Sequence, residues 1–170
     1  MKTIRISKNK KPLSSGLFGK YFRISKNRGV KVFGKGHRKI ETIFSRPKTY
    51  LSAQKECELL KKAEKSKISP KFAQLVIVIY RKKFYPAIKM QHFGGDILYN
   101  HDRYLKPSYA YVNRFGEIKK NKTIKMKSFI LNKLKKAKIV HIDLHSANVM
   151  VNSQGKVRVI DFSPEWIKEI

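Results

Sequence analysis

Hydrophobic and polar positions alternate in short runs over the first half of the chain. Extended segments are predicted at residues 13–15, 21–25 and 30–33, with Gly16, Gly19 and a turn at residues 27–29 separating them. Two further β-type runs cover residues 75–80 and 85–90. These runs predict a small antiparallel sheet.

Two longer segments have helical spacing instead. Residues 52–65 contain no proline or glycine and place Leu59, Leu60 and Ala63 on one face, with Glu56 a turn earlier. Residues 126–138 also predict a helix, since lysines lie opposite an apolar stripe made of Phe129, Ile130, Leu134 and Ala137. An α+β fold is therefore expected.

The pattern weakens in the middle of the chain. Residues 93–96, Phe-Gly-Gly-Asp, predict a linker, and residues 97–105 predict a short helix. Residues 106–123 are polar and contain Pro107 and Gly116, which favours a loop.

The last thirty residues predict a β-hairpin with polar residues at one end. Residues 149–151 and 157–160 are β-branched runs around a glycine-containing turn. Antiparallel pairing brings the start of the first strand beside the end of the second, so Asn148 and Asp161 should lie about 5 Å apart. Asp143 precedes this ribbon in a loop that can curl over the same place.

Composition narrows the class of protein. The single cysteine, Cys57, excludes an internal disulfide and a thiolate zinc cluster, and indicates a reducing compartment. The longest apolar run, residues 75–80, is too short for a bilayer span, and the basic N-terminus lacks the apolar region of a signal peptide. A cytoplasmic protein without a membrane span is expected.

The net charge of +29 indicates an anionic partner. Nucleic acid is a candidate, because neutralised phosphates supply most non-specific affinity. However, 31 of the 40 basic residues are lysines spread along the whole chain, which also fits a solvated lysine-rich surface.

The predicted hairpin end carries the chemistry of phosphoryl transfer. Two carboxylates and an amide oxygen are hard ligands that suit Mg²⁺, and a carboxylate left off the metal can accept a hydroxyl proton. Each residue alone is explained better as a cap or turn residue. Together, Asp143, Asn148 five positions later and Asp161 thirteen positions after that satisfy several independent constraints.

Here the chain resembles the protein-kinase-like fold. Residues 141–148, His-Ile-Asp-Leu-His-Ser-Ala-Asn, are similar to the catalytic loop, and residues 161–163, Asp-Phe-Ser, to the metal-binding Asp-Phe-Gly triplet. The resemblance implies Asp143 as the catalytic residue that orients or deprotonates the acceptor hydroxyl. It implies Asn148 and Asp161 as Mg²⁺ ligands and His141 as a packing and hydrogen-bonding residue.

The N-terminal half fits the same resemblance, which implies a glycine-rich loop and a phosphate-binding lysine. Lys31 lies between two valines in an apolar strand, where an unpaired ammonium would be costly, and Glu56 resembles its partner, with Glu58 as the alternative. The nucleotide-binding residues implied for ATP are Ser15, Gly16, Phe18, Gly19 and Lys31, with Met90, Gln91, Phe93 and Asp96 from the hinge. Residues 1–93 would form the N-lobe and residues 94–170 a reduced, mainly helical C-lobe, with ATP between them.

The departures from the family bear on the substrate. Only seven residues follow Ser163, so the activation segment of an ordinary protein kinase is not seen, and Ser163 replaces glycine. Such a minimal kinase resembles bacterial type III secreted effectors, a family implied to phosphorylate the acidic eukaryotic heat-shock chaperone after secretion into the host cytoplasm. With histidine at position 145, the catalytic loop instead resembles that of small-molecule and lipopolysaccharide-sugar kinases. A third reading is an inactive basic module that binds nucleic acid or anionic surfaces.

Overall fold

The computed structural model describes residues 1–170 except 17–18, 46, 95, 98–119, 145–147 and 153. The chain divides into two compact units. The first contains Met1–Leu59 and Lys71–His92, and the second contains Leu60–Pro70 and Phe93–Ile170. The fold is mixed α and β, as expected.

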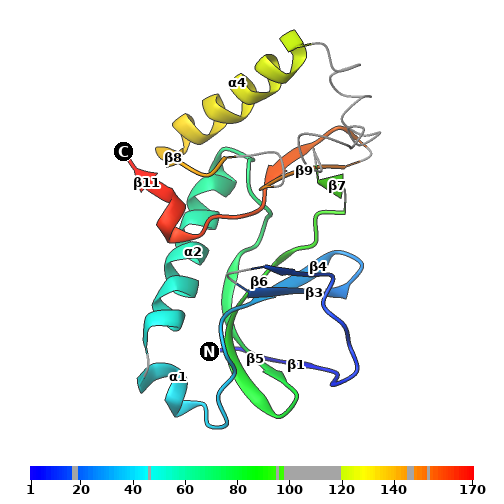
Figure 1. Ribbon diagram of the computed structural model, residues 1–170, viewed down its shortest axis with the longest axis vertical. Helices are drawn as coiled ribbons and strands as arrows, with labels where there is room; N and C mark the ends of the chain where they lie inside the picture. Colours follow the sequence, from blue (N-terminus) through cyan, green and yellow to red (C-terminus); the bar gives the residue numbers. More distant parts are fainter. Residues whose placement is uncertain (17–18, 46, 95, 98–119, 145–147, 153) are drawn as a thin grey trace. The chain divides into compact units, whose positions relative to one another are not determined.

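A six-stranded sheet forms the first unit (Figure 1). Its spatial order is β1-β5-β6-β4-β3-β2. The strands are β1 (Thr3–Ile6), β2 (Ser14–Gly16), β3 (Gly19–Ser25), β4 (Arg28–Val32), β5 (Gln74–Tyr80) and β6 (Lys83–Gln91). The predicted runs in β2 to β6 are confirmed.

The expectation of a purely antiparallel sheet is wrong at one edge. β1 pairs with β5 in parallel, with Thr3 opposite Ile77 and Ile6 opposite Tyr80. The four residues of β1 are too few to show a period in the sequence, and their partner lies some seventy positions away. Short edge strands of this kind are recruited by tertiary pairing rather than by local pattern.

One face of this sheet builds a compact apolar core. Phe22, Val30, Val32, Val76 and Val78 are buried together there with Ile6, Tyr80 and Ala87. Successive side chains of a strand point to opposite faces, so Lys31, between two core valines, points to the other face. This alternation places the only charged residue of the Val30–Val32 run away from the core.

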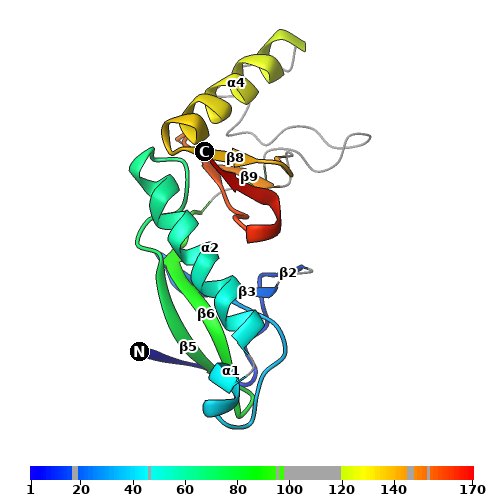
Figure 2. The ribbon, with the colours of Figure 1, turned by 90° about the vertical axis from the view of Figure 1, so that its left-hand side faces the viewer.

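Two helices follow the sheet's first four strands. They are α1 (Glu41–Ser45) and α2 (Pro47–Lys65). α2 begins five residues before the predicted start at residue 52, because proline is tolerated in the first helical turn. Its buried stripe is Ala53, Glu56, Cys57, Leu60 and Ala63. Figures 1 and 2 show the N-terminal part of α2 running along β5 and β6.

The second unit combines one long helix with two small sheets (Figure 2). β9 lies between β10 and β7, and β11 pairs with β8. The elements are β7 (Asp96–Ile97), α4 (Lys120–Lys136), β8 (Ile139–His141), β9 (Val149–Val151), β10 (Val157–Val159), the short 3-10 helix η2 (Pro164–Trp166) and β11 (Ile167–Glu169). The predicted hairpin of residues 149–151 and 157–160 is confirmed in β9 and β10.

Three expectations for this unit need correction. Ile97 lies in β7 rather than in a helix, and residues 98–105 are outside the described residues. The predicted loop of residues 106–123 falls mostly outside them too, but its last four residues belong to α4. Ile130, Leu134 and Ala137 of the predicted α4 stripe are buried together with Met126, but Phe129 is 39% exposed. Among the helices that the structure describes, none combines the length and apolar character needed to cross a bilayer.

Candidate active site

Lys31 and Glu56 form an ion pair in the first unit, in which the lysine contacts both carboxylate oxygens. The Lys31 Nζ lies 2.7 Å from Glu56 Oε1 and 2.9 Å from Oε2. β4 supplies the lysine on the sheet face opposite the valine core, and the buried stripe of α2 supplies the glutamate. The predicted pairing is confirmed.

Burial separates Glu56 from the other candidate, Glu58. Glu56 is fully buried, whereas Glu58 is exposed and accepts a hydrogen bond from Gln54 Nε2 at 3.2 Å. The side chain of Lys31 is 15% exposed, and its Nζ lies 5.2 Å from the centre of the Phe33 ring. A buried carboxylate is stable only when it is paired, so this pair fixes the position of the Lys31 ammonium.

The predicted glycine-rich loop is the turn between β2 and β3. Ser15 lies opposite Lys20, and Gly16 lies opposite Gly19, while Phe18 is outside the described residues. Gly19 has a φ of +155°, and a Cβ there would lie 2.3 Å from the Val32 carbonyl oxygen. Only glycine fits this approach between β3 and β4.

The predicted hinge residues have different environments. In the first unit, Met90 is buried, and the Gln91 N–H donates to the Lys71 carbonyl at 2.7 Å. In the second unit, Phe93 is buried under the Arg158 guanidinium, 5.3 Å from its ring centre, and the backbone of Asp96 pairs with Val151. The ring of Phe93 is thus engaged in packing.

The contact between Tyr21 and His92 was not predicted from the sequence. The Tyr21 hydroxyl lies 3.1 Å from His92 Nδ1, which ties β3 to the residue after β6. Burial raises the pKa of Tyr21 to about 12 against a smaller opposing effect of Arg23, and burial lowers the pKa of His92. Gly29 makes room for this tyrosine, because a Cβ at Gly29 would lie 1.8 Å from the hydroxyl.

In the second unit, Asp143 and Asn148 are in direct contact. The Asn148 amide donates to the Asp143 carbonyl at 3.0 Å and approaches its carboxylate Oδ2 at 3.5 Å. Asp143, which follows β8, therefore lies against Asn148 at the start of β9, as predicted. Residues 145–147, which include His145, are outside the described residues.

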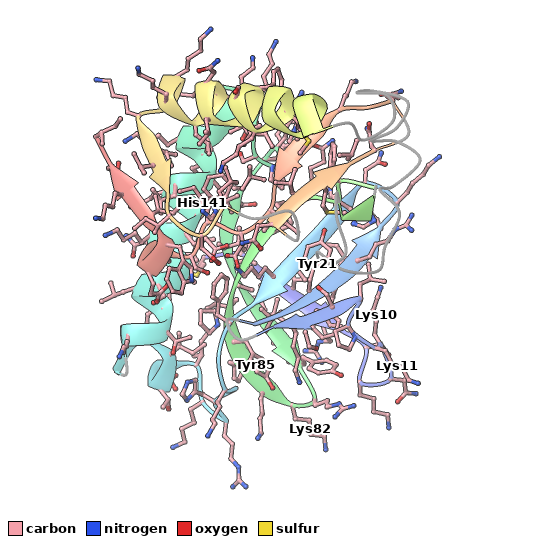
Figure 3. All side chains as sticks on the ribbon, turned by 45° about the horizontal axis from the view of Figure 1, so that its top comes forward. Lys10, Lys11, Tyr21, Lys82, Tyr85 and His141 are labelled. Carbon is pink, nitrogen blue, oxygen red and sulfur yellow. The ribbon has the colours of Figure 1, made fainter. Side chains whose placement is uncertain are left out.

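Asp161, which follows β10, is held by hydrogen bonds from its neighbours. Its Oδ1 accepts hydrogen bonds from the Ser163 N–H at 3.1 Å and from the Ser163 hydroxyl at 2.8 Å. His141 of β8, labelled in Figure 3, is buried, and its Nε2 donates to the Asp161 carbonyl at 2.6 Å. His141 also packs edge-on against Phe162, so the packing role expected for this histidine is confirmed.

The register of β9 and β10 joins these two groups. Val149 pairs with Val159, and the Ile160 N–H donates to the Asn148 carbonyl at 2.9 Å. Asn148 and Asp161 therefore lie at the same end of the ribbon, as predicted. Asp143 contacts the first of them, so all three residues belong to one corner of the second unit.

The donor chemistry of this corner fits Mg²⁺. In the described part of the chain, no three histidine, cysteine, aspartate or glutamate side chains gather as a metal cluster. A cation at this corner would be held by the Asp161 carboxylate and the Asn148 amide oxygen. Mg²⁺ commonly takes one or two protein oxygens and completes its shell with water and substrate phosphates.

Protein-family models gave no match to this chain, and neither did curated proteins.

Proposed function

We propose that this chain is an ATP-dependent phosphotransferase with a protein-kinase-like fold, acting on a serine or threonine hydroxyl of a protein. The observation that carries the proposal is the contact of Asp143 with Asn148 at the ribbon end that leads to Asp161. These three oxygen-bearing side chains are the set that phosphoryl transfer requires. The Lys31–Glu56 pair supports it independently from the other unit.

Each residue has a distinct task in the proposed reaction. Lys31, fixed by Glu56, binds the ATP phosphates as a point charge. Asp143 orients the acceptor hydroxyl and takes its proton as the oxygen forms a bond to the terminal phosphorus. The bond from that phosphorus to the bridging oxygen breaks, and ADP leaves with the electron pair.

Asn148 and Asp161 would hold Mg²⁺, which when bound neutralises charge on the phosphates. Ser163 restrains the Asp161 carboxylate through two hydrogen bonds, and His141 restrains the backbone of the same residue. Asn148 in turn restrains Asp143. The corner is pre-organised by its own hydrogen bonds, as positioning catalysis demands.

A narrower form of the proposal concerns the substrate. The net charge of +29 favours association with an acidic acceptor protein. Together with the resemblance to minimal secreted effector kinases, this supports an acidic host chaperone as the acceptor. A sugar or other small-molecule hydroxyl is the competing acceptor, and the assay below separates the two.

The test is transfer of the labelled terminal phosphate of ATP, with and without Mg²⁺, to a panel of acidic proteins, serine peptides and sugars. Asp143→Asn should lower the rate by about 10²- to 10⁴-fold, the usual contribution of a positioned base. Asp161→Asn should abolish Mg²⁺-dependent transfer. Glu165→Gln, which changes an exposed carboxylate of the same unit, is the matched control and should have little effect.

Wild-type rates in both aspartate variants would refute the proposal, as would a wild-type protein inert towards every acceptor. Circular dichroism of each variant checks that it is folded. Labelling of sugars but not proteins would move the chain to the small-molecule class.

A further inference from the structure

Six basic side chains gather at the turn between β5 and β6. Three come from the loop after β1 and three from the turn and the first residue of β6, and all six are exposed. We name this set the hairpin-end patch; it consists of Lys8, Lys10, Lys11, Arg81, Lys82 and Lys83. Figure 3 shows Lys10, Lys11 and Lys82 around this end of the sheet.

Specific contacts hold the two segments together. The Tyr80 hydroxyl donates to the Lys10 carbonyl at 3.2 Å, and Arg81 Nε donates to the Lys8 carbonyl at 3.5 Å. The loop itself is closed by the Lys10 N–H, which donates to the Ser7 carbonyl at 3.0 Å. The Arg81 guanidinium rests over the Tyr80 ring, 5.2 Å from its centre. The patch is therefore built on the fold rather than scattered over it.

No carboxylate near the patch in sequence offsets its charge. Residues 1–40 and 65–95 contain no aspartate or glutamate. Within the described residues, none of the six side chains takes part in an ion pair. Six like charges held close together repel one another, so the arrangement favours an anionic occupant.

The turn itself carries backbone strain. Arg81 and Lys82 have φ values of 50° and 61°, the left-handed conformation that two-residue hairpin turns require at both positions. Asparagine and glycine adopt this conformation readily, and long basic residues do so at a cost. Strain retained at an exposed site points to a function for the residues that cause it.

We propose that the hairpin-end patch binds the phosphate backbone of duplex nucleic acid. Five of the six side chains are lysines, which act as point charges and respond to charge density rather than to the geometry of a carboxylate. A duplex carries one charge per about 1.7 Å, denser than an acidic peptide, and binding releases its counterions.

The environment of Tyr80 favours a duplex over a single strand. Tyr80 is buried beneath the Arg81 guanidinium, so its ring is not open to stacking by an unpaired base. This inference does not depend on the proposed phosphotransfer, and binding is measured without ATP.

The test is the salt dependence of binding to a labelled 20-base-pair DNA duplex of mixed sequence, followed by fluorescence anisotropy between 50 and 200 mM KCl. The patch variant changes all six basic residues to glutamine. The matched control changes six exposed lysines of α2 and α4 to glutamine, namely Lys55, Lys61, Lys65, Lys127, Lys135 and Lys136.

Each phosphate contact contributes about 0.9 to the slope of log K against log salt. The slope of log K against log salt should therefore be shallower by about 5 in the patch variant, and by less than about 1 in the control. Equal losses in the two variants would overturn the proposal, since charge alone would then explain binding. An unchanged slope in the patch variant would also overturn it.

A second variant separates folding from binding. Arg81→Asn with Lys82→Gly gives the turn its preferred residues, so this variant should melt at or above the wild-type temperature. Because two positive charges are removed, its slope of log K against log salt should be shallower by about 2. A variant with wild-type binding would contradict the role of the turn. Competition by polyglutamate, or by single-stranded DNA, at lower concentration than the unlabelled duplex would assign the patch to that other partner and refute the proposal.

Discussion

Replacing Lys31 with methionine leaves the carboxylate of Glu56 buried without its cation. Glu56 has no exposed surface, and both of its oxygens accept from Lys31 Nζ at 2.7 and 2.9 Å. Breaking a buried ion pair by removing one partner typically costs about 3–5 kcal/mol. A domain of ordinary stability has about 5–15 kcal/mol, so Lys31→Met should be strongly destabilised yet still measurable.

The double variant should behave differently from the sum of the singles. Lys31→Met with Glu56→Met replaces both charges by apolar side chains of similar length, and such replacements are commonly neutral or stabilising. Its free energy of unfolding should lie within about 1 kcal/mol of wild type or above it. Glu58→Met, on the exposed side of α2, is the control and should change stability by less than about 0.5 kcal/mol.

Urea unfolding measures these free energies. Circular dichroism follows the whole chain and Trp166 fluorescence follows the second unit, so coincident transitions are needed before free energies are compared. The coupling energy between the two sites should be at least about 2 kcal/mol, because Lys31→Met alone costs about 3–5 kcal/mol and the double variant at most about 1. Additive losses in the double variant would refute the reasoning.

The same double variant also separates structure from catalysis. If Lys31 holds the ATP phosphates, the folded double variant should lose at least about 100-fold in phosphotransfer. A double variant that is stable and fully active would show that the pair is only structural.

Two further changes test particular contacts. Gly19→Ala should lower the free energy of unfolding by about 1–3 kcal/mol, because its φ is +155° and its Cβ would lie 2.3 Å from the Val32 carbonyl oxygen; Gly94→Ala, with no atom within 4 Å of its Cβ, should change it little. A thermal melt compares the two, and equal shifts would contradict the close approach. In Tyr21→Phe the free energy of unfolding should fall less steeply between pH 10 and pH 12 than in the wild type. Because the Tyr21 phenol ionises near 10 when unfolded and near 12 when folded, its contribution is complete below pH 10 and is lost as pH rises towards 12. An unchanged slope of stability against pH in that range would argue against a buried Tyr21.

Local pattern was sufficient for the elements whose residues show a clear period. β3 to β6 and the β9–β10 hairpin follow from β-branched runs between turn residues. α2 begins at Pro47, five residues before the predicted start, and the first helical turn tolerates proline. In α4 three of the four predicted stripe residues are buried, and only Phe129 is exposed, because Met126 takes the position that completes the buried face.

Pairings that depend on distant chain segments were harder to predict. β1 and β11 are only four and three residues long, and each is defined by its partner strand rather than by its own sequence. At the candidate site, spacing alone indicated that Asn148 and Asp161 share one end of the ribbon, because antiparallel register fixes it. The bonds from Ser163 to Asp161 and the Tyr21–His92 contact were not predicted, although an aspartate two residues before a serine is a recognisable turn signal.

The most direct test of the account is where a divalent cation binds in a crystal grown with Mn²⁺ and a non-hydrolysable ATP analogue. Anomalous scattering from manganese locates the ion without ambiguity. Manganese should be coordinated by oxygens of Asn148, Asp161 and the nucleotide phosphates. Manganese bound away from both side chains would contradict the proposed phosphotransfer site.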